Sequence, residues 1–250
     1  RQFALTMSVF SNQAANARNI LGSWWVILLP TIQAATFGLI FGVILGDARP
    51  DNFIPFLFTG VFLFTFFSNS FSNGASSVTN NAGLVRSLSF PRILLPISSV
   101  IRQFLNLLPQ LLVMFAILLI YSEPITLEWL LFIPILISMT CFSLGLAMIS
   151  ARLTVHVRDL SKLIPFITRI LFYTSGVFFE VERILGSTPV LLQIASLNPV
   201  YQFLTLARGV LMDGRETSAF LWIASSIWAV GTLLIGLFFF WRAEERYGRE

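Results

Sequence analysis

Charged side chains are scarce in this sequence of 250 residues. Lysine and arginine together number 16, aspartate and glutamate number 12, and charged residues make up only 11% of the chain, whereas 56% is hydrophobic. In a soluble domain roughly a quarter of the residues are charged. The composition therefore excludes an ordinary soluble domain and predicts a protein that lies within a lipid bilayer.

Residue types that support catalysis or metal binding are also scarce. Cys141 is the only cysteine and lies in an apolar run, which excludes an internal disulfide and favours a packed thiol. His156 is the only histidine and has no second ligand at metal-binding spacing, so we interpret it as an ordinary loop residue. Lys162, the only lysine, follows no glycine-rich loop, so no Walker-type nucleotide site is present. We expect no catalytic site, no metal and no cofactor bound by this chain.

Long apolar segments are abundant. A bilayer core of roughly 30 Å requires about 20 mostly apolar helical residues. Six segments meet this requirement: 22–46, 53–77, 97–121, 127–151, 160–179 and 219–241. They predict an all-α integral membrane protein with a single transmembrane domain over 1–250, six spans within 22–241, and a tail at 242–250.

The charges between these segments predict their orientation. The linkers 78–96 and 152–162 are mainly basic, whereas 47–52 and 122–128 are mainly acidic. Because basic linkers stay on the cytoplasmic side of a membrane, we expect both termini to be cytoplasmic.

Two further segments are apolar but do not resemble spans. In residues 1–21, apolar side chains recur every three or four positions, which predicts an amphipathic interface helix on the inner membrane surface. In residues 180–218, Pro189, Asn198 and Pro199 divide the apolar stretch into pieces of about 9 and 13 residues. These pieces are too short to cross, so we expect a re-entrant pair or two interfacial helices on the outer side.

Polar and aromatic residues inside the spans suggest a path through the protein. Ser68, Asn69, Ser72, Asn73 and Ser76 form a polar stripe in the second span, and Gln103, Asn106 and Gln110 form another in the third. Such residues either join helices by hydrogen bonds or line a water-filled cavity, and the sequence leaves both open. Among the 26 phenylalanines, Phe172 and Phe179 are candidates for stacking on a sugar chain in a translocation path.

A ladder of cations begins the fifth span. Arg158, Lys162, Arg169 and Tyr173 follow at intervals of four, seven and four, which places all four on one helical face and the three cations within about 40° of one another. Arginine and lysine are suited to bind a pyrophosphate group. The alternative is that these side chains extend to the lipid headgroups and only anchor the helix.

Three motifs resemble one transporter family. The stretches "LVRSLSFPRILLPIS" (84–98), "VRDLSKLIPFITRILFYTSGVFF" (157–179) and "LNPVYQFLTLARGVL" (197–211) are similar, in the same order, to segments of ABC-2 type permeases that export polysaccharides. That group includes exporters of O-antigen, capsule, teichoic acid and galactan. The resemblance implies the permease subunit of an ATP-driven exporter, which moves a polyprenyl-pyrophosphate-linked polysaccharide across the bacterial plasma membrane.

The resemblance also implies partners and site residues. A second copy of the chain, two separate ATPase subunits that hold ATP and Mg, the lipid-linked polysaccharide and membrane lipid are the expected partners, with no role for nucleic acid. Coupling to the ATPase would involve Arg86, Phe90, Pro91 and Arg92, and the turn of an outer gate would contain Asn198 and Pro199. The two arginines also satisfy a simpler reading, in which they fix the topology and contact anionic lipid.

Three other functions compete with this one. An ABC-2 exporter of a drug or small lipid would have similar spans. A membrane enzyme acting on polyprenyl-linked sugars would need a set of carboxylates or a metal site, and Glu123, Glu128, Glu180 and Glu182 form no recognisable set. A passive channel is disfavoured because no charged residue that could form a ring occupies the centre of a span.

Overall fold

The fold is described from a computed structural model. The structure describes residues 24–44, 46, 50, 52–87, 90–157, 159–186, 188–215 and 217–247. The predicted interface helix at 1–21 and the predicted site residue Arg158 lie outside the described residues.

Five long helices form most of the molecule. Within the described residues, the helices long and apolar enough to cross a membrane begin with α2 (Trp25–Ile44), α3 (Phe53–Ala75) and α6 (Leu94–Ile120). They continue with α7 (Phe132–His156), which follows the short helix η3 (Leu127–Leu131), and α12 (Ala219–Tyr247). These helices coincide with five of the six predicted spans and confirm an all-α membrane protein.

The sixth predicted span, 160–179, contains a shorter helix. Helix α8 covers Leu160–Thr174, and its 15 residues extend about 22 Å at 1.5 Å per residue. An irregular turn follows, in which Gly176 has φ 63°, a left-handed conformation that glycine adopts without steric cost. Pro165 lies inside α8 without ending it.

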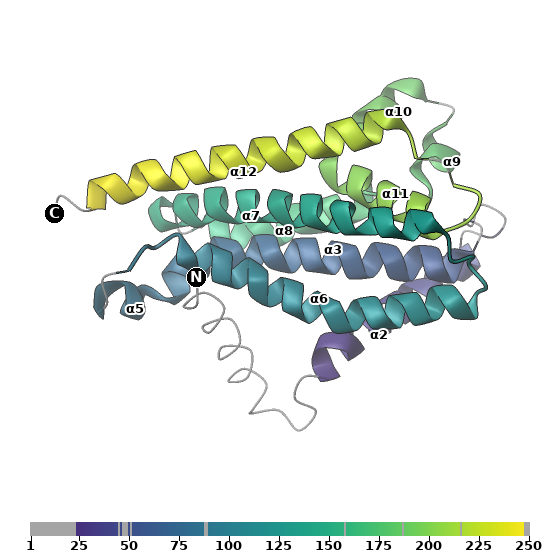
Figure 1. Ribbon diagram of the computed structural model, residues 1–250, viewed down its shortest axis with the longest axis horizontal. Coiled ribbons are helices and arrows are strands. Elements are labelled where there is room, and N and C mark those ends of the chain that lie inside the picture. Colours follow the sequence, from purple (N-terminus) through teal and green to yellow (C-terminus); the bar gives the residue numbers. More distant parts are fainter. Residues whose placement is uncertain are drawn as a thin grey trace.

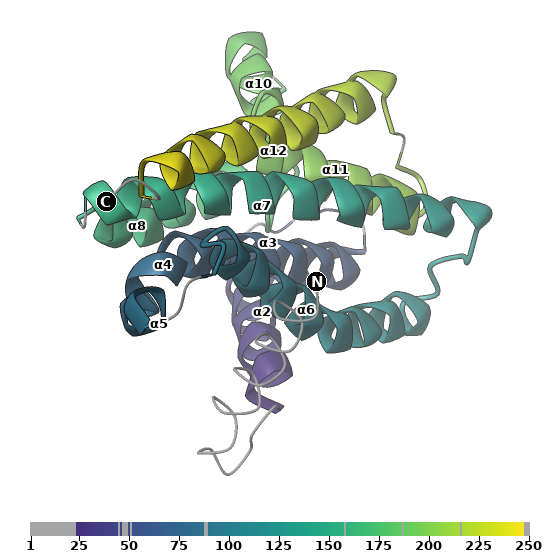
Figure 2. The same cartoon turned by 60° about the vertical axis from the view of Figure 1, so that its left-hand side comes forward.

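Short helices occur at both ends of the bundle. Helices α4 (Ser77–Asn80) and α5 (Ala82–Ser87) project at one end, where α12 also finishes (Figures 1 and 2). Towards the other end lie α9 (Val181–Leu185), α10 (Pro189–Ser196) and α11 (Pro199–Leu211). We call these the α5 end, which the charge pattern predicts to be cytoplasmic, and the α9 end. The 8 residues of α10 and 13 residues of α11 confirm the predicted division at Asn198 and Pro199.

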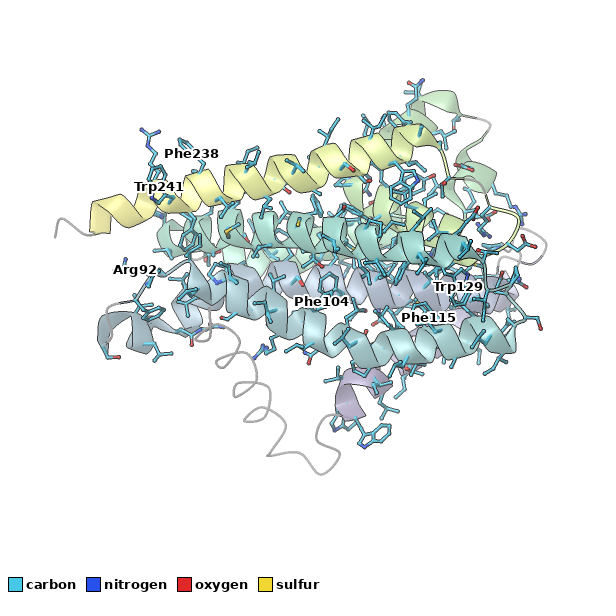
Figure 3. All side chains as sticks on the ribbon, viewed as in Figure 1. Arg92, Phe104, Phe115, Trp129, Phe238 and Trp241 are labelled. Atoms are coloured by element: carbon cyan, nitrogen blue, oxygen red, sulfur yellow. The ribbon has the colours of Figure 1, made fainter. Side chains whose placement is uncertain are left out.

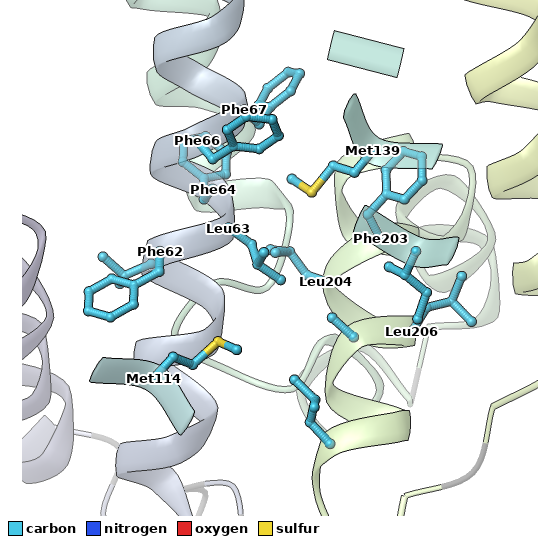
Figure 4. Packing of buried hydrophobic residues seen from close by; sticks show 14 of the residues in the cluster. Phe62, Leu63, Phe64, Phe66, Phe67, Met114, Met139, Phe203, Leu204 and Leu206 are labelled. Carbon is cyan, nitrogen blue, oxygen red and sulfur yellow. The ribbon is translucent and has the colours of Figure 1, made fainter. Parts of the chain in front are cut away.

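Helices α3 and α11 form the centre of the fold. In the most apolar part of α3, 72% of the residues are buried, against 17% in α2. Helix α11 buries every residue from Val200 to Leu211 except Thr205, so it is inserted among the long helices and does not lie on their surface. Figure 4 shows this core, with labelled side chains Phe62, Leu63, Phe64, Phe66, Phe67, Met114, Met139, Phe203, Leu204 and Leu206.

The pair α7 and α12 is held by close backbone approach. A Cβ atom added to Gly145 would collide with the backbone at Thr232, and one added to Gly236 would collide with the backbone of Gly145. Small residues permit such contact in a bilayer, where association depends on packing because lipid is as apolar as the side chains. The outer face of α12 carries exposed large apolar residues, among them Phe238 and Trp241, which point away from the bundle in Figure 3.

Candidate functional site

A polar cavity of about 280 Å³ lies between α2, α3 and α8, and we call it the central cavity. It is lined by Gln33, Phe37, Phe64, Thr65, Ser68, Asn69, Pro165, Thr168, Arg169, Phe172 and Tyr173. Arg169 is the only charged residue among these lining residues, and none of them is acidic. The cavity therefore combines hydrogen-bonding groups with one positive charge.

The central cavity brings together residues that the sequence assigned to two different roles. Arg169 and Tyr173 come from the cation ladder, and Ser68, Asn69 and Phe172 come from the translocation path. Because α8 lies against α3, the two groups face the same space. Arg169 has no ion pair or hydrogen bond with any residue that the structure describes, so its donors are available to a ligand.

Other predicted residues lie elsewhere. The side chain of Lys162 is 81% exposed, and its Nζ is 3.3 Å from Oδ1 of Asp159, so it does not line the central cavity. Asn73 lines a different cavity near the α5 end, and Phe179 lines one near the α9 end. Ser72 lies on α3 between Asn69 and Asn73, and it lines none of these three cavities.

Aromatic rings form one wall of the central cavity. The ring centroids of Phe64 and Phe172 are 5.0 Å apart in an edge-to-face arrangement, and those of Phe37 and Phe172 are 5.3 Å apart. Tyr173 also contacts Phe172, at 5.5 Å between centroids. Such faces are apolar and suit the apolar face of a sugar ring or a polyprenyl chain.

Gln110, one of the polar residues predicted in the third span, joins two helices. Gln110 donates a hydrogen bond from Nε2 to the carbonyl oxygen of Val26, 3.0 Å away, and so links α6 to α2. Gln103 is 5% exposed. The two readings that the sequence left open therefore apply to different helices, since Ser68 and Asn69 of α3 line a cavity whereas Gln110 of α6 joins two helices.

A second cavity, of about 320 Å³, lies near the α9 end and contains a buried arginine. Arg208 is 4% exposed, and its guanidinium donates hydrogen bonds to the carbonyl oxygens of Phe56, Gly176 and Val177. A buried charge is tolerated only where its donors are satisfied in this way. Arg208 therefore fixes α11 to the start of α3 and to the turn after α8.

Ion pairs surround this second cavity. Glu180 accepts from Arg215 at 2.5 Å and lies 3.4 Å from Nε of Arg183. The hydroxyl of Tyr201 donates to Glu182 over 3.3 Å. These contacts tie α9 and the segment before α12 to α11.

The predicted gate turn is held at the end of α8. The side chain of Asn198 accepts a hydrogen bond from the backbone N–H of Val200 at 3.0 Å, and so caps α11. Its Nδ2 donates to Oγ of Ser175 over 2.9 Å. Pro199 occupies the first position of the helix, where its missing N–H costs nothing.

Glu123 has a structural position that sequence reasoning missed. Its side chain is 3% exposed and accepts hydrogen bonds from Nδ2 of Asn52 at 2.6 Å and from the N–H of Asp213 at 2.8 Å. It thus joins the ends of three helices, α3, α6 and α11. No local pattern identifies it, because its partners are 71 and 90 residues away in the sequence.

The predicted coupling residues lie at the α5 end. Arg86 belongs to α5, while Phe90, Pro91 and Arg92 lie shortly before α6. The N–H groups of Leu94 and Leu95 donate to the carbonyl oxygens of Pro91 and Arg92, both over 3.1 Å, so this connection continues directly into α6. Figure 3 shows Arg92 beside α5 at this end.

These helices and cavities describe a multi-pass membrane protein with polar space inside the bundle. The family model described as ABC-2 type transporter matches residues 5–212, and the chain belongs to this family. The chain is 28% identical over 221 residues to an O-antigen export system permease protein RfbA of Myxococcus xanthus, covering 84% of each chain. It is 25% identical over 232 residues to a protein of the same name from Klebsiella pneumoniae, covering 92% of this chain and 87% of the relative.

Proposed function

We propose that this chain is the permease subunit of an ATP-driven exporter that moves a polyprenyl-pyrophosphate-linked polysaccharide across the bacterial plasma membrane. The observation that carries the proposal is the central cavity, where Arg169, which has no partner among the described residues, lies beside aromatic rings and polar side chains. Its relatives named as O-antigen export permeases support the same substrate class. They give no support to a drug or small-lipid exporter.

The lining of the central cavity suits the pyrophosphate and the sugars of such a cargo. The guanidinium of Arg169 offers forked donors to the pyrophosphate, and the hydroxyl of Tyr173 offers one more. Gln33, Ser68 and Asn69 supply donors and acceptors for sugar hydroxyls. The rings of Phe64 and Phe172 provide apolar faces. The polyprenyl tail stays in the bilayer, against the exposed apolar faces of α2 and α8.

Energy for transport comes from two ATPase subunits, which hold ATP and Mg, acting on two copies of this chain. The α5 end provides the contact, through Arg86, Phe90, Pro91 and Arg92. Because Pro91 and Arg92 are hydrogen-bonded to the start of α6 and α6 packs on α3, a displacement of Pro91 and Arg92 reaches the polar stripe of α3.

The first experiment is purification of the tagged chain from its native membrane. We expect an ATPase to accompany it in stoichiometric amount. The double variant Arg86→Glu with Arg92→Glu should insert normally but lose the ATPase, because it reverses both charges at the proposed contact. The control Arg242→Glu reverses an exposed arginine on α12 and should retain it. No ATPase with the unmodified chain contradicts the proposed function, and equal retention by the double variant contradicts the coupling role.

A further inference from the structure

A third cavity, of about 250 Å³, lies between the last turns of α3, α4 and the first turns of α6, and we call it the α4 cavity. It is lined by Asn73, Ser77, Asn80, Asn81, Leu95, Ser98, Ser99 and Arg102. Arg102 is the only charged residue among the lining residues, and none of them is acidic. Sequence reasoning did not single out Arg102 or this cavity.

Two side chains in the α4 cavity have donors without partners. Half-buried Arg102 has no ion pair or hydrogen bond with any described residue, although a guanidinium carries five N–H donors. Ser77 is 5% exposed, and its buried Oγ has no hydrogen-bond partner among the described residues. Leaving such groups unsatisfied is costly. The lining of the cavity therefore suits a ligand that is negatively charged and rich in acceptor oxygens.

The position of the cavity indicates which anion reaches it. Arg102 is eight residues from the first residue of α6, Leu94, which is about 12 Å along the helix axis. This is the α5 end, so Arg102 lies within the first turns of α6 after the predicted cytoplasmic loop. A phosphate group attached to a lipid can reach this depth while its chains stay in the bilayer.

A stripe of polar residues on α3, continued by the first residue of α4, connects the α4 cavity with the central cavity. Thr65 and Asn69 line the central cavity, and Asn73 and Ser77 line the α4 cavity, each four residues after the last. The three members on α3 turn by about 40° each around that helix, so the stripe passes from the α8 side of α3 towards its α6 side. Arg169 lines the central cavity together with Thr65 and Asn69, and Arg102 lines the α4 cavity together with Asn73 and Ser77.

We propose that the α4 cavity binds the phosphate-bearing headgroup of a lipid, with Arg102 as the charged contact and Ser77 as a second donor. The headgroup is either the pyrophosphate of the lipid-linked cargo, held before it moves along the stripe to Arg169, or the phosphate of a bilayer lipid. The first source deepens the proposed function and rests on it. The proposed binding site does not rest on the proposed function, because binding of a lipid headgroup is measured without transport.

Binding is tested with the purified full chain in nanodiscs of phosphatidylcholine, with farnesyl pyrophosphate as the probe. All proteins carry Arg169→Gln, so that the central cavity does not contribute its arginine. Adding Arg102→Gln should weaken probe binding more than about tenfold, since it removes a charged donor. Arg102→Lys should restore part of the affinity, and Ser77→Ala should weaken binding about threefold to tenfold. Arg242→Gln, a matched loss of an exposed arginine, should leave it unchanged.

A second arm identifies the source. Nanodiscs that also contain phosphatidylglycerol, without the probe, are examined by native mass spectrometry for retained lipid. Loss of probe binding on Arg102→Gln supports the pyrophosphate headgroup, and loss confined to phosphatidylglycerol retention supports a bilayer lipid. If neither changes while the variant keeps the thermal unfolding temperature of its parent, the site is refuted. If the variant unfolds early, the comparison of Arg102→Lys with Ser77→Ala decides: unchanged binding in both refutes the site.

Discussion

Arg208 of α11 donates two hydrogen bonds to the carbonyl oxygen of Phe56 in α3, from Nε at 3.2 Å and from Nη2 at 3.1 Å. Its guanidinium carbon also lies 3.4 Å from the centroid of the Phe56 ring, a cation–π contact. These two residues are 152 positions apart in the sequence. The pair therefore anchors α11 to α3, the central helix of the bundle.

Gly60 makes room for this anchor, and its replacement should destabilise the protein. A Cβ atom at position 60 would lie 2.6 Å from the carbonyl oxygen of Val177 and would also collide with Nη2 of Arg208. Overpacking of this kind costs about 1–3 kcal/mol, so Gly60→Ala should lower the Tm in detergent by several degrees. Gly83→Ala is the control, because nothing lies within 4 Å of its added Cβ. Equal unfolding temperatures for the two variants would show that Arg208 is not confined as described.

Glu123→Gln should also destabilise the chain. The amide keeps one acceptor oxygen, but its NH₂ group must face either the Asn52 or the Asp213 donor. Loss of a buried charged hydrogen bond costs about 1–3 kcal/mol. Differential scanning fluorimetry should give a lower Tm than for Glu128→Gln, which alters an exposed carboxylate. If both variants match the parent, Glu123 does not hold the three helix ends together.

The spans were predictable because their cause is local. Length and hydropathy alone located α2, α3, α6, α7 and α12, and Asn198 with Pro199 marked the start of α11. The predicted span 160–179 was less well described, because the end of α8 depends on the turn at Gly176. The sequence alone could not show that residues 199–211 are buried among the long helices, because this burial depends on tertiary packing.

The candidate site was predictable only in part. Spacing selected Arg169, Tyr173, Ser68 and Asn69 but could not show that they share one cavity, because α3 and α8 are far apart in sequence. Lys162 belongs to the same predicted helical face as Arg169. It nevertheless lies near the start of α8, outside the central cavity. The roles of Arg208 and Glu123 depend on partners that are far away in the sequence, and the role of Arg102 depends on its having no partner among the described residues. Hydrophobic periodicity in the sequence indicates neither.

Orientation can be tested by cysteine labelling in a Cys141→Ala background. Ser218→Cys and Ser87→Cys place thiols at exposed positions near opposite ends of the bundle. The positive-inside pattern predicts that an impermeant thiol reagent labels position 218 in intact cells, and position 87 only after permeabilisation. If only position 87 is labelled in intact cells, the orientation is the reverse of the predicted one. If both positions are labelled in intact cells, both lie outside, which contradicts a bundle that crosses the membrane between them.

Arg169→Gln should separate cargo recognition from ATP hydrolysis. The variant keeps hydrogen-bonding capacity but removes the charge that would meet pyrophosphate in the central cavity. In the reconstituted complex we expect lipid-linked glycan to stop stimulating ATP hydrolysis, while basal hydrolysis is unchanged. Arg242→Gln should behave like the parent. Full stimulation of the Arg169 variant would mean that this arginine only anchors α8 at the headgroups.

The most direct measurement is transport by the purified chain together with the ATPase that accompanies it, in vesicles loaded on one leaflet with a lipid-linked polysaccharide. We predict that the glycan becomes accessible to a glycosidase on the opposite side when ATP and Mg are added, and that it remains protected with a non-hydrolysable ATP analogue. Protection that persists with ATP, in vesicles where the complex hydrolyses ATP, would contradict the proposed export of polysaccharide.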